Sequence, residues 1–411
     1  MLGVAVVLGA AQTMLADWPS FLGPQHGHAP SQGIPLKFSA AKDLMWKTEL
    51  PGEGWSSPVV EGGRVWMTTA LNEGQSLRAL CVNLESGKLI HNIELFHVAA
   101  PEPKHKMNSH ASPSPVLEKG KAYFSFGMYG SACVDSKSGK ILWKNTELKH
   151  DHDGNGPGST PILYKDLYIL NCDGTELRYV AALNKHTGKL VWKTDRSNDM
   201  SSMVSNRRKA YATPAIFNID GKDQLVSPGA YRISSYEPTT GKELWSVDSV
   251  GFSNVPVPLH GYGLVYVTTG FPKPQMWAID PTGRGLINDT HVRWVNKRAM
   301  PAKPSPIMVG DHIYVVADNG IASCVDAKTG ETIWYERVKG EFSASPLHVD
   351  GKIYLFDMSG SVVVLKASPK FEILSRSTLG DGFMSSPAVV DSSIVLRSKS
   401  ALYRLRGESA L

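Results

Sequence analysis

Short apolar runs separated by tight turns recur along the whole chain. The run KIYLFD at 352–357 alternates apolar and polar positions, and SVVVLK at 361–366 follows it after a Ser-Gly pair. Runs of this length with a period of two, rich in Val, Ile and aromatic residues and bounded by Gly, Asp and Ser, are typical of β-strands joined by hairpin turns. The pattern predicts an all-β protein of short antiparallel strands.

Eight of the expected strands begin with the same motif, a small residue and a proline ahead of an apolar run. Proline has no N–H donor and is tolerated at the first position of a strand. The mean spacing of about 47 residues is typical of a solenoid or propeller built from one repeated unit. Eight such units fill the chain from about residue 43 to 405, and they start at Pro58, Pro115, Pro161, Pro214, Pro258, Pro306, Pro346 and Pro387.

A tryptophan follows a turn glycine by four residues in several units. Each unit has a hairpin loop such as Asp326 to Gly330, in which the aspartate bonds the backbone and the glycine supplies a positive φ. Because tryptophan recurs at one position of the unit, we expect its large side chain to pack between neighbouring blades. The pairs are Gly139 and Trp143, Gly188 and Trp192, Gly241 and Trp245, and Gly330 and Trp334, with His91 in place of tryptophan in the first unit.

The last unit lacks a fourth strand, and the chain has an unassigned strand near its start. Residues 43–47, DLMWK, match ILWK at 141–144. Pairing this segment with the last unit would close the ring and remove exposed sheet edges. The sequence therefore predicts an eight-bladed β-propeller of four-stranded antiparallel blades, closed by an N-terminal strand that completes the last blade.

The first residues predict export. Residues 2–12 are apolar but far shorter than the roughly 20 residues that span a bilayer, and a small-residue cleavage point follows at Ala16, although no Lys or Arg precedes the apolar run. We expect a signal peptide over 1–16, an N-terminal extension over 17–42 and one propeller domain over 43–411, in the periplasm or outside the cell. No cysteine precedes Cys81, so no lipid anchor is expected, nor is a transmembrane segment.

Charge and cysteine content narrow the function classes. A net charge of +5 over 411 residues is mild, whereas nucleic-acid-binding proteins concentrate basic residues, so no nucleic-acid partner is expected. Cys81, Cys133 and Cys324 occupy one repeat position, which predicts buried filler on a strand rather than disulfides. Cys172 has no evident partner.

The aligned units share the motif Ala/Cys-x-Asp-x-x-Thr-Gly-x-x-x-Trp, as in CVDAKTGETIW and ALNKHTGKLVW. This motif resembles the pyrroloquinoline-quinone (PQQ) type of propeller repeat, over essentially the whole mature chain. The resemblance implies the eight-bladed fold and two function classes: non-catalytic propellers such as the assembly lipoprotein BamB, and quinoprotein dehydrogenases. The opening DWPSFLGP also looks like the start of exported PQQ-like propellers of planctomycete-type bacteria.

The chain departs from both classes. BamB is lipid-anchored, and this chain lacks the cysteine that such an anchor requires. Quinoprotein alcohol dehydrogenases of this fold are larger and carry an adjacent Cys-Cys pair and a calcium or lanthanide ion, and this chain has no adjacent cysteines. The resemblance implies a fold and these two function classes, and the smaller size and the missing Cys-Cys pair favour the first. We therefore expect an exported, monomeric, non-catalytic binding scaffold without a cofactor. The alternative is a PQQ-dependent oxidoreductase that holds PQQ with calcium.

Loops that do not repeat are the candidates for binding. Those leading from each fourth strand to the next unit are expected to gather at one mouth of the central channel. Three of them, 98–110, 196–209 and 297–303, hold nine cations against Glu102 and Asp199, which predicts a cationic mouth for a protein partner or an anionic ligand; ordinary solvated loops are the alternative. The candidate binding residues are His110, Asn155, Arg207, Arg208, Lys209 and Lys303.

The loop at 150–161 is the densest polar cluster. Asp151, Asp153 and Asn155 match the opening of a calcium loop, but the position that should supply a closing glutamate is Ile162. His150 and His152 without a third ligand do not define a zinc site. A polar turn is the expected structure, with the calcium site as the weaker alternative. No residue pattern indicates a nucleophile or general base, so no catalytic residue is expected.

Overall fold

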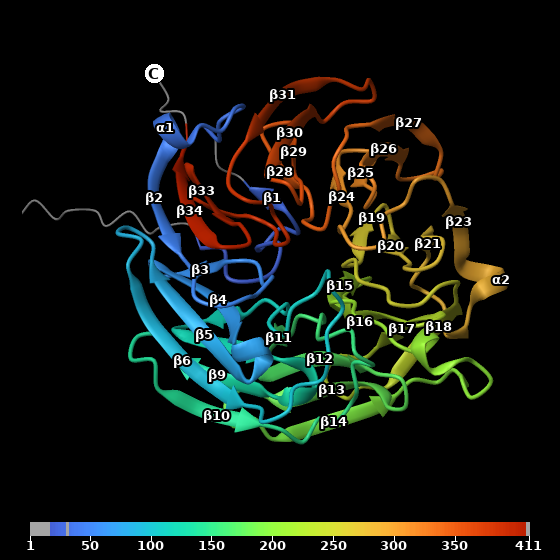
Figure 1. The fold of residues 1–411 in the computed structure, drawn as a ribbon. Coiled ribbons are helices and arrows are strands. Elements are labelled where there is room, and N and C mark those ends of the chain that lie inside the picture. The colour runs from blue at the N-terminus through green and yellow to red at the C-terminus, as the bar shows by residue number, and fades with distance from the viewer. Residues whose placement is uncertain (1–16, 30–32, 408–411) are drawn as a thin grey trace, which may run out of the picture.

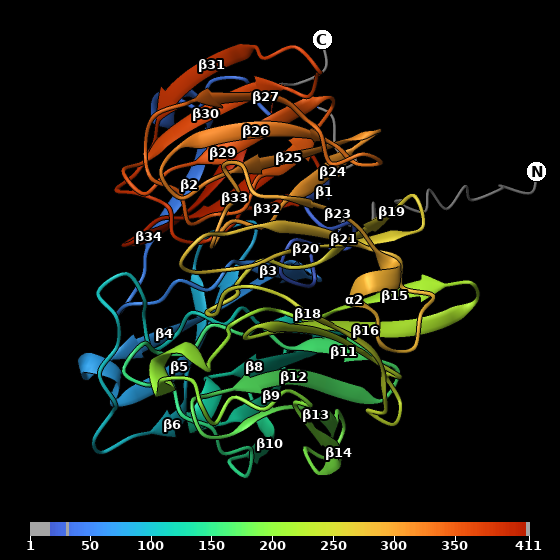
Figure 2. The same ribbon diagram turned by 90° about the vertical axis from the view of Figure 1, so that its right-hand side faces the viewer.

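The computed structural model describes residues 17–29 and 33–407. Eight antiparallel sheets stand side by side around a central axis in a closed ring, which Figure 1 shows along the axis and Figure 2 from the side. All eight repeat prolines directly precede the innermost strand of a sheet. The predicted all-β eight-bladed propeller is therefore confirmed.

The first four blades follow one another in chain order. Each is listed from its innermost to its outermost strand. They are β3 (Val59–Glu61), β4 (Arg64–Leu71), β5 (Ser76–Asn83) and β6 (Leu89–His97); β7 (Val116–Glu118), β8 (Lys121–Ser125), β9 (Ser131–Asp135) and β10 (Ile141–Asn145); β11 (Ile162–Tyr164), β12 (Leu167–Asp173), β13 (Arg178–Asn184) and β14 (Leu190–Asp195); and β15 (Ala215–Ile219), β16 (Lys222–Gly229), β17 (Arg232–Tyr236) and β18 (Glu243–Asp248).

The other four blades repeat this order. They are β19 (Leu259–Gly261), β20 (Leu264–Thr268), β21 (Met276–Ile279) and β23 (Val292–Asn296); β24 (Ile307–Val309), β25 (His312–Val316), β26 (Ile321–Asp326) and β27 (Thr332–Arg337); β28 (Leu347–Val349), β29 (Lys352–Phe356), β30 (Ser361–Lys366) and β31 (Ile373–Thr378); and β32 (Ala388–Val390), β33 (Ser393–Arg397) and β34 (Ala401–Arg406), completed by β2 (Leu44–Glu49).

Two blades carry a fifth strand of two residues. In the fifth unit an insertion between β21 and β23 forms β22 (Gly285–Leu286) and α2 (Asn288–His291), and β22 pairs in parallel with β18 of the neighbouring blade. Strand β1 (His28–Ala29) adds in parallel to β28 on the inner side of the seventh blade. The remaining sheets are four-stranded, as predicted.

The ring closes through β2, which pairs antiparallel with β34. The predicted closing strand was 43–47, and the observed one is Leu44–Glu49. Asp43 instead ends the short helix α1 (Ala40–Asp43), because its carboxylate accepts a hydrogen bond from the N–H of Ser39 at 2.8 Å. Closure by an N-terminal strand is confirmed.

The hydrophobic core lies between the blades. The buried cluster that contains Val59 and Phe124, for example, joins the first and second blades. The repeated tryptophans seal these interfaces at their outer edge: the Trp143 ring lies against Gly188 of the next blade, and its indole N–H donates to the carbonyl of Lys185 at 2.8 Å. His91 lies in the same way against Gly139. The predicted packing role of these residues is confirmed.

The N-terminal extension crosses the ring on the face of the β3–β4 turn. Trp18 exchanges two backbone hydrogen bonds with Val60 of the first blade, each 2.8 Å long. Pro19 then accepts a bond from the second blade, and Leu22 is buried in the core between the fourth and fifth. Gly27 accepts a bond from His348 of the seventh at 2.9 Å. A segment that reaches blades on opposite sides of the ring must pass across its centre.

The cysteines are buried and free: Cys81, Cys133, Cys172 and Cys324. The first, second and last of them lie on the third strand of their blades, as the filler interpretation predicted. Among the described residues no helix is long and apolar enough to cross a membrane. The predicted signal peptide, residues 1–16, lies outside the described residues.

Candidate functional site

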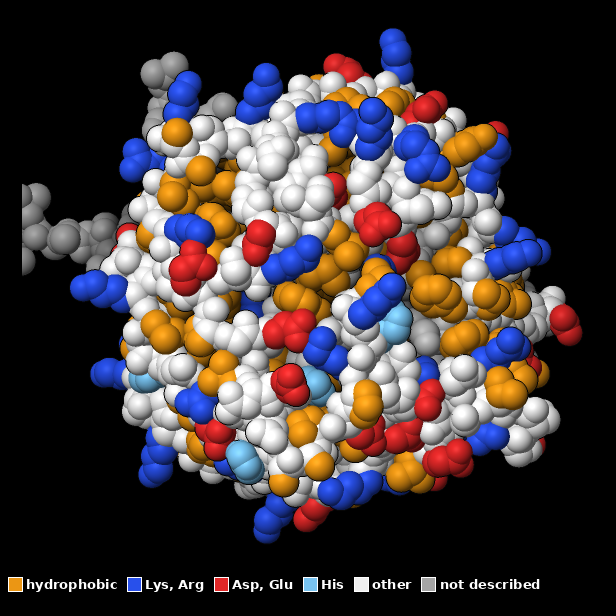
Figure 3. Space-filling model, viewed as in Figure 1, with side chains coloured by type: hydrophobic (Ala, Val, Ile, Leu, Met, Phe, Trp, Pro, Cys, Tyr) orange, Lys and Arg blue, Asp and Glu red, His pale blue; other side chains and the backbone are white. Residues whose placement is uncertain are grey.

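A cavity of about 830 Å³ opens where the connections between blades meet, on the face here called the mouth. Figure 3 views this face and shows hydrophobic side chains gathered around its centre. The loops that enter all eight blades contribute to the wall, for example through Trp55 for the first blade and Met384 for the last. No other feature of the described chain draws on every blade in this way.

Large apolar side chains cover much of the cavity wall. Six aromatic and methionine side chains from the mouth loops are partly or fully exposed, although residues of these types are usually buried. Phe271, on the β20–β21 connection, is 53% exposed, and Val204 nearby on the loop before the fourth blade is 60% exposed. The six wall residues are Trp55, Met107, Tyr211, Phe252, Phe271 and Met384.

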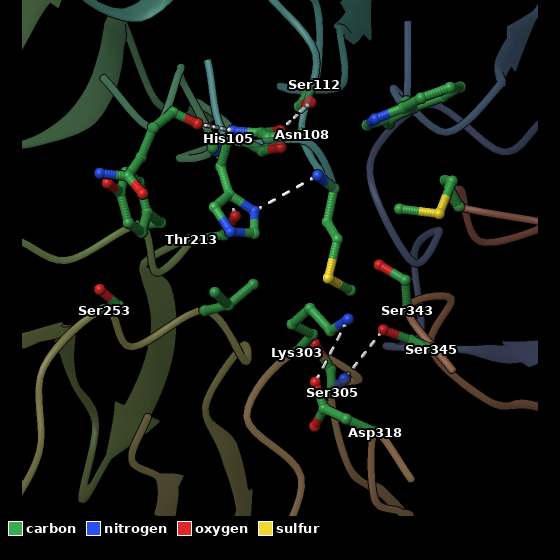
Figure 4. A pocket seen from close by; sticks show the side chains of 18 of the residues that line it. His105, Asn108, Ser112, Thr213, Ser253, Lys303, Ser305, Asp318, Ser343 and Ser345 are labelled. Atoms are coloured by element: carbon green, nitrogen blue, oxygen red, sulfur yellow. Dashed lines mark hydrogen bonds and ion pairs between the residues drawn. The ribbon is translucent and has the colours of Figure 1, made fainter. Parts of the chain in front are cut away.

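A ring of hydroxyl groups surrounds the bore at the base of this cavity. At seven of the eight positions, the residue before the repeat proline accepts a hydrogen bond, through its side-chain oxygen, from the backbone N–H of the equivalent residue in the preceding blade. The bond from Ser305 to Ser345 measures 2.9 Å and is drawn in Figure 4. Seven such bonds join Ser57, Ser114, Thr160, Thr213, Val257, Ser305, Ser345 and Ser386, with one break where Val257 has no hydroxyl.

The sequence pattern predicts only that the residue before each repeat proline is small, and the structure adds a second requirement. The hydroxyl oxygen is the feature that the ring uses, because it satisfies a buried backbone donor that has no ladder partner at the strand start. Each hydroxyl also keeps its own O–H. No described residue accepts a hydrogen bond from any of the seven, and all seven line the cavity.

The charged groups of the wall are mostly paired. Lys209 lies 2.5 Å from Asp153, and its side chain is only 5% exposed. Lys303 lies 3.4 Å from Asp318, as Figure 4 shows, and the same carboxylate accepts the N–H of Ala302 at 2.7 Å. Glu341 makes no side-chain hydrogen bond or ion pair with any described residue. Three wall carboxylates therefore face two lysines that are already neutralised.

Three of the candidate binding residues line this cavity, namely Asn155, Lys209 and Lys303. His110 lies behind the wall, where its Nε2 is 2.8 Å from the carbonyl of Glu102. Arg208 donates to the Met203 carbonyl and pairs with Glu176 at 3.3 Å, and Arg207 is exposed outside the lining. The mouth thus brings together half of the proposed set.

Five of the nine loop cations counted in the sequence have acidic partners on other segments: Lys104, Arg196, Arg208, Lys209 and Lys303. Arg196 is the clearest case: it is buried, and its guanidinium binds both oxygens of Asp173 at 2.8 and 2.5 Å. Lys104 pairs with Glu53 at 3.1 Å. A count within the loops could not include these carboxylates, which come from strand ends and hairpins far away in the chain. The free positive charge at the mouth is correspondingly smaller.

The calcium-loop pattern at 151–155 does not form a common site. The Asp151 carboxylate accepts hydrogen bonds from the N–H and hydroxyl of Thr175 at 2.8 and 2.7 Å, which hold its pKa below the usual range although burial opposes them. Asp153 turns instead to Lys209, and the Asn155 amide donates to the Asp153 carbonyl. Among the described residues no three His, Cys, Asp or Glu side chains are grouped as metal ligands.

His150 and His152 are buried beneath the mouth, with ring centroids 5.2 Å apart. Burial lowers the pKa of both imidazoles, and that of His152 falls well below its usual value, which the neighbouring His150 reinforces. Neutral, buried rings of this kind support the loop from below rather than project into the cavity.

Comparison with known proteins now decides the family. The family model described as outer membrane protein assembly factor BamB matches residues 38–169, 176–286 and 289–368, which is most of the chain. The chain belongs to this family. Its full-length relatives are distant: BamB of Yersinia pestis is 21% identical over 361 residues, covering 78% of this chain and 86% of the relative. BamB of Burkholderia pseudomallei is 32% identical over 95 residues, 23% of this chain and 24% of the relative.

This chain shares its architecture with solved structures of a BamB and of quinoprotein-type dehydrogenases. BamB from Moraxella catarrhalis superposes with a TM-score of 0.62 at 14% identity, covering 88% of this chain and 99% of that one. A europium-containing methanol dehydrogenase gives 0.69 at 12% identity, with 92% and 96% coverage. The quinohemoprotein alcohol dehydrogenase of Comamonas testosteroni gives 0.67 at 13%, with 96% and 81% coverage. Identities this low show the fold alone.

The wall residues do not fit PQQ with calcium. PQQ carries three carboxylates, so its site needs free cations, whereas the lining has an excess of carboxylates and both lysines are engaged. A hard cation needs several oxygen ligands around one point, and Asp151 and Asp153 are committed to different partners. We therefore derive no chemical step through this cofactor.

Sequence reasoning missed the aromatic and methionine wall and Glu341. The unpaired Glu341 follows Lys339 and Gly340, in which positive φ values of 64° and 91° mark a sharp turn into the mouth. The only sequence signal that places Glu341 at the mouth is its position in the connection just before Pro346. Phe271 lies on a hairpin rather than on a connection between blades, so the search restricted to those connections did not include it.

Proposed function

We propose that this protein is a non-catalytic binding scaffold of the cell envelope, which holds a protein partner at the mouth of the propeller. Membership of the BamB family supports a role among proteins that assist outer membrane protein assembly. The predicted signal peptide supports envelope localisation.

One observation carries the proposal: the apolar cavity at the mouth includes the exposed Phe271 in its wall, and the exposed Val204 lies two residues before the wall residue Asn206. Partly exposed aromatic and methionine side chains around a central pocket are the usual anchors of a protein interface, because burying them against a partner removes a large apolar area from water. Apart from the unpaired Glu341, the charged groups of the wall are paired, and no described wall residue pairs a nucleophile with a base.

The test is affinity capture of envelope proteins by a double variant, Phe271→Ser with Val204→Ser, compared with wild type. The matched control is Leu190→Ser with Val191→Ser on the outer strand β14, where the two side chains are 48% and 49% exposed. The mouth variant should lose the captured partner and the control should retain it. Equal capture by all three proteins would refute the proposal.

A further inference from the structure

The mouth cavity combines an apolar wall, hydroxyl donors and an unpaired carboxylate, and this combination selects one class of partner. We propose that the cavity binds an extended segment of a partner protein that carries a lysine or arginine flanked by apolar residues. This inference rests on the proposed function and specifies its ligand.

The charge of the wall favours a cation. The Glu341 carboxylate has no side-chain partner among the described residues. The loop that carries Glu341 packs against the segment that carries Asp318, because the N–H of Phe342 donates to the Asp318 backbone carbonyl at 3.0 Å. The two lysines of the cavity wall, Lys209 and Lys303, are already held by Asp153 and Asp318. Lys399 on the last blade is occupied with the Met358 carbonyl at 2.9 Å. An incoming cation meets an uncompensated negative charge here, whereas an anion must first displace a lysine from its aspartate.

The aromatic residues of the wall suit the same ligand. An ammonium or guanidinium group is attracted to the face of an aromatic ring, most strongly where water is excluded. Trp55, Tyr211 and Phe252 come from three different blades and line the same cavity. The long apolar stem of lysine or arginine also buries against such a wall while its charged end reaches a carboxylate.

The hydroxyl ring supplies the complement to a peptide backbone. Its O–H groups have no acceptor among the described residues, so they can donate to peptide carbonyl groups that enter the bore. The depth available is limited, because Phe21 of the N-terminal extension lines the cavity from the opposite side. A segment would therefore enter from the mouth and stop at this floor, as a loop or a chain end does.

The experiment titrates the full-length protein with three short peptides that differ only in a central residue, arginine, norleucine or glutamate, flanked by leucine and alanine. Calorimetry gives the affinities. The arginine peptide should bind about tenfold more tightly than the glutamate peptide, with norleucine between them, and its affinity should fall as salt is raised. Equal or tighter binding of the glutamate peptide would overturn the inference.

The variant Glu341→Lys should remove the preference for arginine, and Glu341→Gln should weaken it without reversal. The matched control is Glu331→Lys, an exposed glutamate on the β26–β27 turn at the opposite face, which should leave the affinities unchanged. An unchanged preference in both Glu341 variants would contradict the assignment. If no peptide binds while capture still depends on Phe271 and Val204, the inference fails and the scaffold function stands; if capture is independent of those residues, the function itself fails.

Discussion

The backbone N–H of Ser386 donates to Oγ of Ser57 across 2.9 Å, and this bond joins the last blade to the first at the centre of the ring. At the rim the same junction is closed by β2, whose Trp46 lies against Gly87 and donates its indole N–H to the Leu84 carbonyl at 2.8 Å. The seam thus uses the contacts that join every other pair of blades, although its two sides lie more than 300 residues apart.

Removing the hydroxyl at the seam should destabilise the ring. In Ser57→Ala the buried N–H of Ser386 loses its acceptor, which we expect to lower the free energy of unfolding by about 1–3 kcal/mol. Ser57→Thr keeps the oxygen and serves as the control. Chemical denaturation measures both variants, and an alanine variant as stable as wild type would show that the ring of hydroxyls is not a stabilising element.

Deleting residues 43–48 should cause unfolding or aggregation, because it removes most of β2 and exposes the edge of β34. Thermal melting and size-exclusion chromatography measure the outcome. A truncated protein that stays monomeric and melts like wild type would refute closure by this strand.

Two glycines with the same backbone conformation separate strain from packing. Gly188 has φ +70°, and a Cβ there would lie 2.6 Å from the Trp143 ring, whereas Gly221 has φ +80° with open space around it. Alanine at either position must adopt the left-handed backbone conformation, which lowers the free energy of unfolding by about 1–2 kcal/mol. In Gly188→Ala the contact with the Trp143 ring adds an overpacking cost of about 1–3 kcal/mol. Equal losses of unfolding free energy in the two variants would argue against tight contact between tryptophan and glycine.

The pair of histidines that fixes β1 should make stability depend on pH. Nδ1 of His28 lies 3.0 Å from Nδ1 of His348, and burial, reinforced by His28, lowers the pKa of His348 to about 4. Above about pH 6.5 the imidazole is neutral in both folded and unfolded chains and contributes nothing. Between pH 6.5 and 4 the unfolded chain takes up a proton that the folded protein refuses, so the free energy of unfolding falls.

Unfolding curves across this pH range, compared between wild type and His348→Gln, isolate this contribution from that of the carboxylates. The variant should lose less stability on acidification. A parallel pH dependence in the two proteins would contradict the assignment. Burial, His28 and Lys352 lower the pKa of His348, and together they outweigh Asp350, which raises it.

Most of the fold follows from the sequence, because every unit repeats the same strand, turn and packing signals. The eight prolines, the Gly-to-Trp spacing and the closing strand near Trp46 all lie where their patterns predict. The exceptions are additions from outside the repeat, such as β22, which crosses to a neighbouring blade, and β1, which enters from the N-terminal extension. A two-residue strand is too short to show an alternating pattern, so the sequence does not indicate with which strand it pairs.

The site was less predictable, because its properties depend on which side chains meet. Lys209 and Arg196 counted as free cations in the sequence, yet each is buried against an aspartate from another segment. The cavity wall assembles residues from all eight blade-entry loops, from two hairpins and from the N-terminal extension, and no local motif marks Phe252, Met384 or Glu341 as wall residues.

The most direct test of the scaffold function is photo-crosslinking in living cells. A photoreactive phenylalanine analogue at position 271, at the mouth, is compared with the same analogue at position 190, on the outer strand. We predict a crosslink to another polypeptide from position 271 and none from position 190. A partner crosslinked only from position 190, or from neither position, would contradict the claim that the protein works through its mouth.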